Sequence, residues 1–322
     1  MNSNLLLITI PSYITESGAQ FHDIQLSYRL FGQELGTAPV VLVNHALTGN
    51  CNVTGRGGWW TDVIGIGNAI DTNLYTIVAF NIPGNGFDGF IIDAYQCFVA
   101  RDMARLFLIG LEMLHVSRLF ALIGGSLGGG IAWEMVVLSP KIASHFIPVA
   151  TDWKSTDWLI ANCQVQEQFL QNSTNPVHDA RMHAMLCYRT PASFKQRFQR
   201  SKDTAVARFN VESWLLHHGS KLQKRFQLAS YKLMNQLLRT IDVTNNGEKS
   251  TDVLNAIEAD IHIVAVNSDL FFTAEENRET YQELLNSKKA VTYNEIQSVH
   301  GHDAFLIEHA QLQKMIAPIF KK

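Results

Sequence analysis

A serine flanked by glycines lies between two apolar segments of the chain. Gly124, Ser126 and Gly128 form a G-x-S-x-G motif. The motif follows the apolar run Leu119–Ile123 and precedes the run Ile131–Leu138, as a strand-to-helix turn requires. Such a turn exposes the serine hydroxyl, and the helix N-terminus offers N–H groups to a developing oxyanion. The motif predicts Ser126 as a nucleophile; a glycine-rich turn with an incidental serine is the alternative.

Two later segments supply a candidate base and a candidate acid. A serine hydroxyl is a poor nucleophile until a base accepts its proton, and an acid must orient that base. Around this motif the chain order is serine, acid, histidine. Asp269 lies in the turn after the apolar run Ile261–Val266. His302 lies in the loop after the run Ala290–Ile296. The sequence therefore predicts that Ser126, His302 and Asp269 form a triad.

Both partners of the serine have rivals nearby. His300 competes with His302, which is preferred because it adjoins Gly301 and precedes an apolar stretch. Asp260 is a weaker candidate because it precedes its strand, whereas Asp269 follows it and could also be an ordinary turn residue. The two histidines resemble part of a metal site, but further ligands at nearby spacing are missing, so no metal is expected.

Two backbone N–H groups are the candidate oxyanion donors. One donor normally belongs to the residue after the nucleophile, here Leu127, and the other to the loop after an early strand. That loop is His45–Gly49, directly after the apolar run Pro39–Asn44, and its candidate donor is Leu47. A plain strand-to-helix turn is the alternative for this loop.

A second glycine pattern fits a dinucleotide-binding site, but this interpretation is weaker than the serine triad. Residues Gly84–Gly89 fit G-x-G-x-x-G after an apolar run, and Asp102 lies roughly where a ribose-binding acid would stand. Pro83 interrupts the turn, however, and a nicotinamide site would leave the serine and histidine motifs unexplained. No permanently bound cofactor is expected.

Strand and helix signals alternate in the elements that must position these residues. Short apolar runs bounded by Gly, Pro or Asn alternate with helical spacing up to about residue 150, which predicts a parallel sheet with right-handed crossovers. From Thr151 to about Leu254 only helical patterns are convincing. The expected fold class is α/β, a core of residues 1–150 and 256–322 interrupted by a helical insertion at 151–255. The expected strands are 39–44, 74–80, 119–123, 146–149, 261–266 and 290–296, and the expected helices include 100–115, 131–138, 211–218, 221–238 and 308–319.

Composition narrows the class of protein. The chain has 322 residues, 47% of them hydrophobic, and a net charge of −3, so a nucleic acid is not an expected partner. No apolar run near the start approaches the roughly 18 residues that span a membrane, and no basic segment precedes it as in a signal peptide. Four cysteines without a CxxC pair are typical of a cytoplasmic protein. Residues 151–255 carry an excess of Lys and Arg, which would attract a small anionic ligand or merely form a solvated face.

Several independent segments resemble the homoserine O-acyltransferases, the MetX-like branch of the α/β-hydrolase superfamily. The resemblance extends over most of the chain. Its matching segments are NHALTG (44–49), GWWTDVIGIGNAIDTNLY (58–75), RDMARL (101–106), IGGSLGG (123–129), YRTPASFKQRF (188–198), VESWLLHHGSKLQKRF (211–226) and GHDAFL (301–306).

The resemblance implies an activity and further site residues. It implies acyl transfer from acyl-CoA, as co-substrate, to the hydroxyl of homoserine through a serine acyl-enzyme. It places Arg197 where the family binds the amino-acid carboxylate, with Arg189 and Arg200 as alternatives, and Asp303 where the family meets the amino group. The helical insertion would then be a lid that forms a homodimer contact.

One departure from the family keeps other functions open. The family usually carries a longer glycine-rich stretch with a Ser-Thr-Gly-Pro segment after its third strand, whereas this chain runs from Asn81 through Gly86 straight into Phe87. A carboxylic-ester hydrolase with the same triad is therefore the second hypothesis. A catalytically silent binding module is the third, and the complete triad argues against it.

Overall fold

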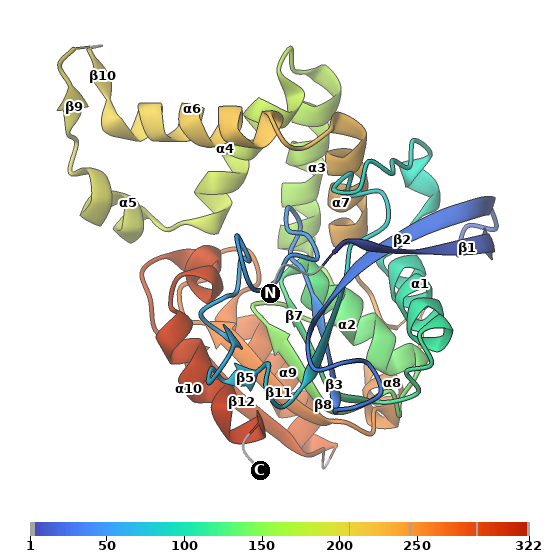
Figure 1. Cartoon of the computed structure of the whole chain (residues 1–322). Helices are drawn as coiled ribbons and strands as arrows, with labels where there is room; N and C mark the ends of the chain where they lie inside the picture. Colours follow the sequence, from blue (N-terminus) through green and yellow to red (C-terminus); the bar gives the residue numbers. More distant parts are fainter. Residues whose placement is uncertain (1–3, 206, 245–246, 288, 321–322) are drawn as a thin grey trace.

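A mostly parallel sheet forms the centre of the protein, seen in a computed structural model that describes residues 4–205, 207–244, 247–287 and 289–320. Its eight strands lie in the order β1-β2-β6-β3-β7-β8-β11-β12 (Figure 1). The pairs β1–β2 and β2–β6 are antiparallel, and the other neighbours are parallel. The strands are β1 (Leu6–Ile14), β2 (Gln20–Gly32), β3 (Val40–Asn44), β6 (Thr76–Phe80), β7 (Leu119–Gly125), β8 (Ala143–Val149), β11 (Asp260–Val266) and β12 (Val291–Ile296).

The middle strands are buried because their residues are almost all apolar. Every residue of β3 and β6 is buried. Successive side chains of a strand point to opposite faces, so Leu42 and Val78 enter one core while Val41 and Ile77 enter the other. The strands predicted from short apolar runs are confirmed within a few residues at their ends.

The antiparallel hairpin β1–β2 at the edge of the sheet was missed by sequence reasoning, which placed no element before Pro39. Its outer strand is only half-buried, and apolar residues face solvent there: Leu7 is 53% and Ile14 62% exposed. A strand with apolar residues on both faces gives neither a clean alternation nor a fully buried run. Its pairing partner, rather than its own pattern, makes it a strand.

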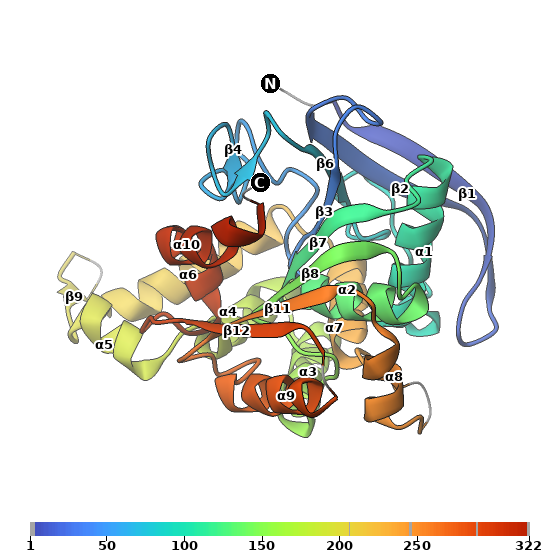
Figure 2. The same ribbon diagram turned by 90° about the horizontal axis from the view of Figure 1, so that it is seen from below.

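Helices cover both faces of the sheet (Figure 2). One face carries α1 (Ala100–Met113), α2 (Leu127–Leu138), α8 (Ser250–Ala256) and α9 (Ala274–Asn286). The other carries α10 (His309–Phe320) and the segment with the short strands β4 (Ile64–Gly65) and β5 (Ile70–Asp71). Within the described ranges, no helix is both long and apolar enough to cross a membrane.

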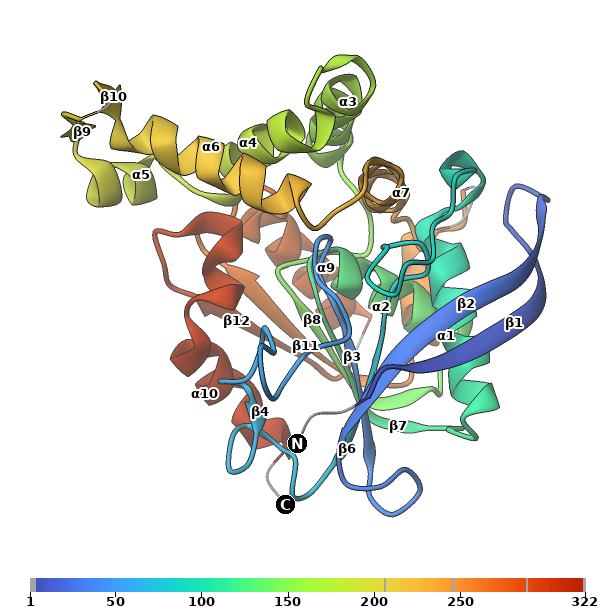
Figure 3. The ribbon, with the colours of Figure 1, turned by 45° about the horizontal axis from the view of Figure 1, so that its top comes forward.

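The chain between β8 and α8 forms a helical lid with a projecting arm. Figures 1 and 3 show the arm, which consists of α5, β9, β10 and α6, reaching away from the sheet. The predicted division at residues 150 and 256 stays a prediction. The elements are α3 (Asp157–Asn172), α4 (Pro176–Tyr188), α5 (Pro191–Phe198), β9 (Lys202–Asp203), β10 (Arg208–Phe209), α6 (Asn210–Gln223) and α7 (Leu228–Arg239).

Two expectations about the lid are wrong. It contains a short hairpin, β9–β10, where only helices were expected. Each of its strands has two residues, which is too few to give a periodic signal in the sequence. The helix predicted at 221–238 is broken: α6 ends at Gln223 and α7 begins at Leu228. In the break, Phe226 is buried and the Arg225 guanidinium donates to the Thr48 carbonyl at 3.0 Å. These tertiary contacts turn the chain where helical spacing alone would continue it.

Candidate active site

Ser126 lies in the turn between β7 and α2 with a strained backbone. Its φ of 55° and ψ of −128° are unusual for a residue with a Cβ atom. The turn is packed so tightly that a Cβ on Gly128 would meet the carbonyl oxygens of Asn44 and His45 at 2.5 Å. This packing holds the loop after β3 against the turn. It confirms the strand-turn-helix context predicted from the G-x-S-x-G motif.

Three side chains from separate strand ends form a hydrogen-bonded relay. The Nε2 atom of His302 lies 2.8 Å from the Ser126 Oγ, and its Nδ1 atom lies 2.7 Å from the Asp269 Oδ2. All three residues are at most 4% exposed. Because β7, β11 and β12 are parallel, their carboxyl ends meet at one edge of the sheet, and each residue follows one of these strands. The structure thus brings together the three residues that sequence reasoning selected, in the geometry of a serine–histidine–acid triad.

The acid and the base are held from several sides. The Asp269 Oδ1 atom accepts hydrogen bonds from the backbone N–H groups of Phe271 and Phe272 at 2.7 and 3.0 Å. Its Oδ2 atom stays directed at His302. Ring centroids of Phe271 and Tyr188 lie 5.1 and 5.6 Å from that of His302. An ionised acid beside an imidazole packed among aromatic rings fixes the ring orientation and stabilises the imidazolium when it forms.

The rival residues lie elsewhere. The His300 Nδ1 atom lies 3.0 Å from the Ser193 Oγ of the lid. Asp260 opens β11 at its amino end, and its carboxylate lies 3.8 Å from the His145 Nδ1. Neither is part of the relay with Ser126. In the described part of the chain, no cluster of three or more His, Cys, Asp or Glu residues is placed to hold a metal ion.

The two candidate oxyanion donors belong to segments that meet at the turn carrying Ser126. Leu127 is the first residue of α2, where an amide has no partner within its own helix. Leu47 follows β3 in the loop that packs on Gly128, and its side chain is buried. The structure therefore places both residues at the turn that carries Ser126, although their role as donors stays a prediction.

Buried His45 braces that loop, a role that sequence reasoning missed. Its Nδ1 atom lies 2.8 Å from the Ala46 carbonyl oxygen, and its Nε2 atom accepts the Ile82 N–H at 3.0 Å. The Asn85 Nδ2 atom lies 3.3 Å from the same Nε2. Burial lowers the pKa of His45 from 6.5 to about 4, so the ring is neutral at pH 7. His45 thereby ties the oxyanion loop to the short segment 81–86, where the chain departs from the family pattern.

Arg197 and Asp303 are not in contact, and each lies near Arg189 in a different way. The Arg197 guanidinium lies over the rings of Phe198 and Trp214, at 5.6 and 5.5 Å from their centroids. Among the residues that the structure describes, no hydrogen bond or ion pair joins Arg197 to the triad. The Asp303 carboxylate is instead paired with Arg189, whose Nε lies 2.9 Å from its Oδ2. Arg189 and Arg197 both line the cavity.

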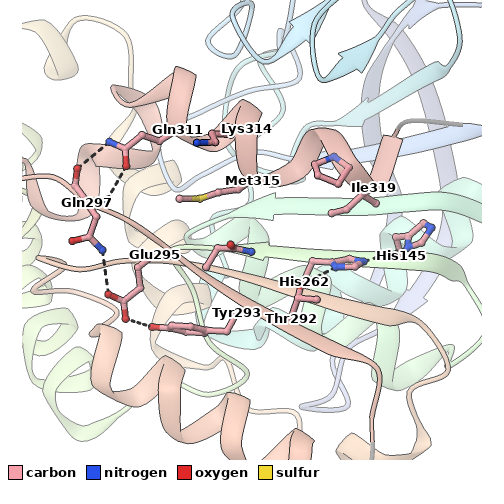
Figure 4. A pocket seen from close by; sticks show the side chains of 12 residues that line it. His145, His262, Thr292, Tyr293, Glu295, Gln297, Gln311, Lys314, Met315 and Ile319 are labelled. Atoms are coloured by element: carbon pink, nitrogen blue, oxygen red, sulfur yellow. Dashed lines mark hydrogen bonds between the residues drawn. The ribbon is translucent and has the colours of Figure 1, made fainter.

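Two of the rings that pack on His302, those of Tyr188 and Phe271, also line a small cavity. A cavity of about 10 Å³, lined by Leu47, Cys163, Tyr188 and Phe271 among others, lies beneath the lid. That is about the volume of a single water. A larger groove of about 830 Å³ runs between β12 and α10, where Figure 4 shows His145, His262 and Gln311 among its lining residues. That groove contains none of the triad residues, so it is not the site of this chemistry.

His302 and His300 can be separated by substitution. We expect His302→Ala to reduce turnover by several orders of magnitude, because no other base reaches Ser126 in the described structure. His300→Ala should cost about tenfold, since its ring contacts Ser193 rather than Ser126. Steady-state kinetics of both variants provide the measurement. Equal losses would contradict the assignment of the base.

His45 makes stability depend on pH. Its folded pKa lies below its unfolded value, so the native state binds fewer protons than the unfolded state between pH 6.5 and about 4. The free energy of unfolding should therefore fall as the pH drops through this window, by up to about 1.4 kcal/mol per pH unit. In denaturant titrations at pH 7, 6 and 5, His45→Gln should flatten this slope. Replacing the exposed His22 by Gln is the control, and an unchanged slope in His45→Gln would refute the assignment.

Comparisons with known proteins agree with this geometry. A family model of the alpha/beta hydrolase fold matches residues 39–308. The homoserine O-acetyltransferase of Chloroherpeton thalassium is 32% identical over 95% of this chain and 86% of its own length. Two solved structures share the fold at 17% identity. The first is esterase E22, with a TM-score of 0.89 over 99% of this chain and 100% of its own. The second is the homoserine O-acetyltransferase from Bacillus anthracis, with a TM-score of 0.87 over 100% of this chain and 98% of its own.

The extent of these matches confirms both the fold and the family resemblance. The family model covers most of the chain, and the curated relative aligns over nearly all of it. The likeness in fold to the two solved structures extends over 99% and 100% of this chain. The chain belongs to the homoserine O-acetyltransferase family of the α/β-hydrolase fold.

Proposed function

We propose that this protein transfers an acyl group, with acetyl favoured over succinyl, from acyl-CoA to the hydroxyl of homoserine. The observation that carries the proposal is the relay from Asp269 through His302 to Ser126, buried beneath a lid in a chain of this family. A relay of this kind activates serine for acyl transfer, and the relatives named homoserine O-acetyltransferase suggest the acceptor. In that role the enzyme serves methionine biosynthesis.

The first half-reaction acylates the serine. His302 Nε2 takes the proton of Ser126 as the Oγ bonds to the thioester carbonyl carbon. The N–H groups of Leu47 and Leu127 stabilise the oxyanion. The carbon–sulfur bond then breaks, the imidazolium returns the proton to the departing sulfur, and an acyl-serine remains. Asp269 keeps the ring in the required tautomer throughout.

The second half-reaction transfers the acyl group. The acceptor hydroxyl loses its proton to His302 and attacks the acyl-serine, and Ser126 recovers its proton as the ester leaves. Transfer requires that the acceptor outcompete water. The burial of Ser126 supports this requirement, since the residue is only 4% exposed.

Acceptor recognition is assigned to Asp303 and Arg197. We place the amino group of homoserine at Asp303 and its carboxylate at Arg197, with Arg189 as the rival. Two observations support this placement: Asp303 directly follows the base in the chain, and Arg189, its ion-pair partner, lines a small cavity together with Arg197. In the ligand-free geometry, Arg189 supplies the positive charge that the amino group would replace.

Carboxylic-ester hydrolysis by the same triad is the second candidate. The short segment 81–86 favours it, because a longer stretch in the family lies near the mouth of the site. The fold is shared with esterase E22, so fold alone does not discriminate between the two reactions. Sequence identity to the transferases favours transfer.

A homodimer through the lid and a cytoplasmic location complete the proposal. Trp158 of α3 and Leu186 of α4 are 55% and 51% exposed, and a second copy would cover such apolar surface. All four cysteines are free, which suits a reducing compartment. A monomeric mass by light scattering would rule out the dimer.

One assay tests the function directly. Purified enzyme should convert acetyl-CoA and homoserine to O-acetylhomoserine well above the rate of acetyl-CoA hydrolysis, and more slowly with succinyl-CoA or serine. Ser126→Ala should abolish turnover with little change in thermal stability, because the substitution removes one oxygen and its single hydrogen bond to His302 and leaves the backbone turn in place. Hydrolysis that equals or exceeds transfer would select the esterase, and a covalent adduct on another residue would exclude the mechanism.

The two half-reactions test Arg197. A guanidinium binds a carboxylate through two parallel hydrogen bonds, which a lysine cannot reproduce. Arg197→Lys should therefore raise the homoserine KM by the equivalent of about 1.5–3 kcal/mol. Acylation of Ser126 by acetyl-CoA should be nearly unchanged. Arg200→Lys, whose guanidinium stacks on Phe209 in the arm, is the matched control. Slow acylation with normal transfer would assign Arg197 to the CoA side instead.

A further inference from the structure

The turn that carries the base is fastened to the lid as well as to the core. The Thr190 Oγ1 donates to the Val299 carbonyl at 2.5 Å. The Ser193 Oγ lies 3.0 Å from the His300 Nδ1. Together with the pair of Arg189 and Asp303, these contacts join three residues of the lid segment 189–193 to three residues of the segment 299–303.

The two segments also touch through their backbones. Gly301 has a φ of +66°, and a Cβ at this position would meet the Tyr188 carbonyl oxygen at 2.9 Å. Tyr188 packs its ring on His302 and ends α4, so its position is fixed by the lid. Such close contact means that the turn cannot shift without displacing the start of α5.

Core contacts hold a different part of the turn. The Ser268 Oγ donates to the Ser298 carbonyl at 2.6 Å and accepts the Gly301 N–H at 3.1 Å. Core contacts therefore reach positions 298 and 301. The lid holds the Val299 carbonyl and the side chains on either side of His302. The lid and the core thus hold different positions of the same turn.

We propose that the lid segment 189–193 positions the base, and that the hydroxyls of Thr190 and Ser193 are positioning residues for His302. The inference rests on the function proposed above for the triad, but not on homoserine as the acceptor. It gives a physical role to the YRTPAS stretch (188–193), one of the segments that match the family. Because α5 begins the arm, these contacts connect the arm to the turn that carries His302.

Two substitutions separate positioning from folding. Ser193→Ala removes the hydroxyl that contacts His300 but keeps the backbone N–H that Thr190 caps at 3.0 Å. Thr190→Val removes the donor to Val299 and also the cap, whereas Thr190→Ser retains both. Ser155→Ala is the control, because its buried hydroxyl donates to the Leu238 carbonyl at 2.5 Å and the contact lies away from the base.

The kinetic readout is acylation of Ser126 by p-nitrophenyl acetate, which needs no acceptor amino acid. We expect the acylation rate constant at saturating ester to fall about tenfold in Ser193→Ala and Thr190→Val, with KM changed less than twofold. Thr190→Ser should stay within twofold of the wild type, and so should Ser155→Ala. If the wild type is acylated by the ester but does not transfer the acyl group to homoserine, the proposed acceptor is rejected. The rate changes in the variants still test this inference.

The spectroscopic readout is the low-field proton resonance of the His302 Nδ1–H bonded to Asp269, measured on the resting enzyme. Exchange with water should broaden it in Ser193→Ala and Thr190→Val, and leave it sharp in Thr190→Ser and Ser155→Ala. An unchanged resonance and an unchanged acylation rate constant in both loss variants, with melting temperatures lowered as in Ser155→Ala, would overturn the proposal. The resonance tests positioning even if the wild type does not react with the ester.

Discussion

The His302 imidazole, hydrogen-bonded to Ser126 on one side and to Asp269 on the other, is the interaction on which the rest of the structure depends. It needs three strand ends at one edge of the sheet, which a parallel arrangement provides. It also needs a strained serine and an aspartate held by two backbone N–H groups. The tight packing of Gly128 against the loop after β3 and the turn between β11 and α9 are the local solutions to these demands.

Two buried polar side chains, Asp269 in the relay and His45 beside it in the loop after β3, avoid the cost of burial in different ways. A charged acid in a dry site is costly unless it is hydrogen-bonded, and Asp269 accepts two backbone N–H groups as well as the imidazole. His45 solves the same problem differently, because it stays neutral and uses both ring nitrogens to join two loops. Water exclusion favours transfer over hydrolysis, so the closed lid and the proposed reaction are linked by the same physical constraint.

The lid contacts the site through the segment 189–193, where α5 begins, rather than through the far end of the arm. The arm projects away from the sheet, whereas the start of α5 contacts the turn that carries His302 (Figure 3). Arg189 connects the proposed acceptor site with the positioning of His302, since it pairs with Asp303, the residue that follows His302. A contact that reaches the arm would therefore reach the geometry of the triad as well, without passing through the core of the sheet.

The sequence by itself located the buried strands of the core and the triad. The strands are short apolar runs, and the three triad residues lie just after three of them. These signals are local, because a buried parallel strand is a continuous apolar run and its C-terminal turn is adjacent in the chain. The sequence favoured His302 over His300 from its neighbours in the chain, and the tertiary structure supplies the physical reason, because the two side chains face Ser126 and Ser193 respectively. It also revealed the hairpin β1–β2, the brace at His45 and the pair of Arg189 with Asp303. Each joins residues far apart in sequence, so that the fold, and no local pattern, brings them together.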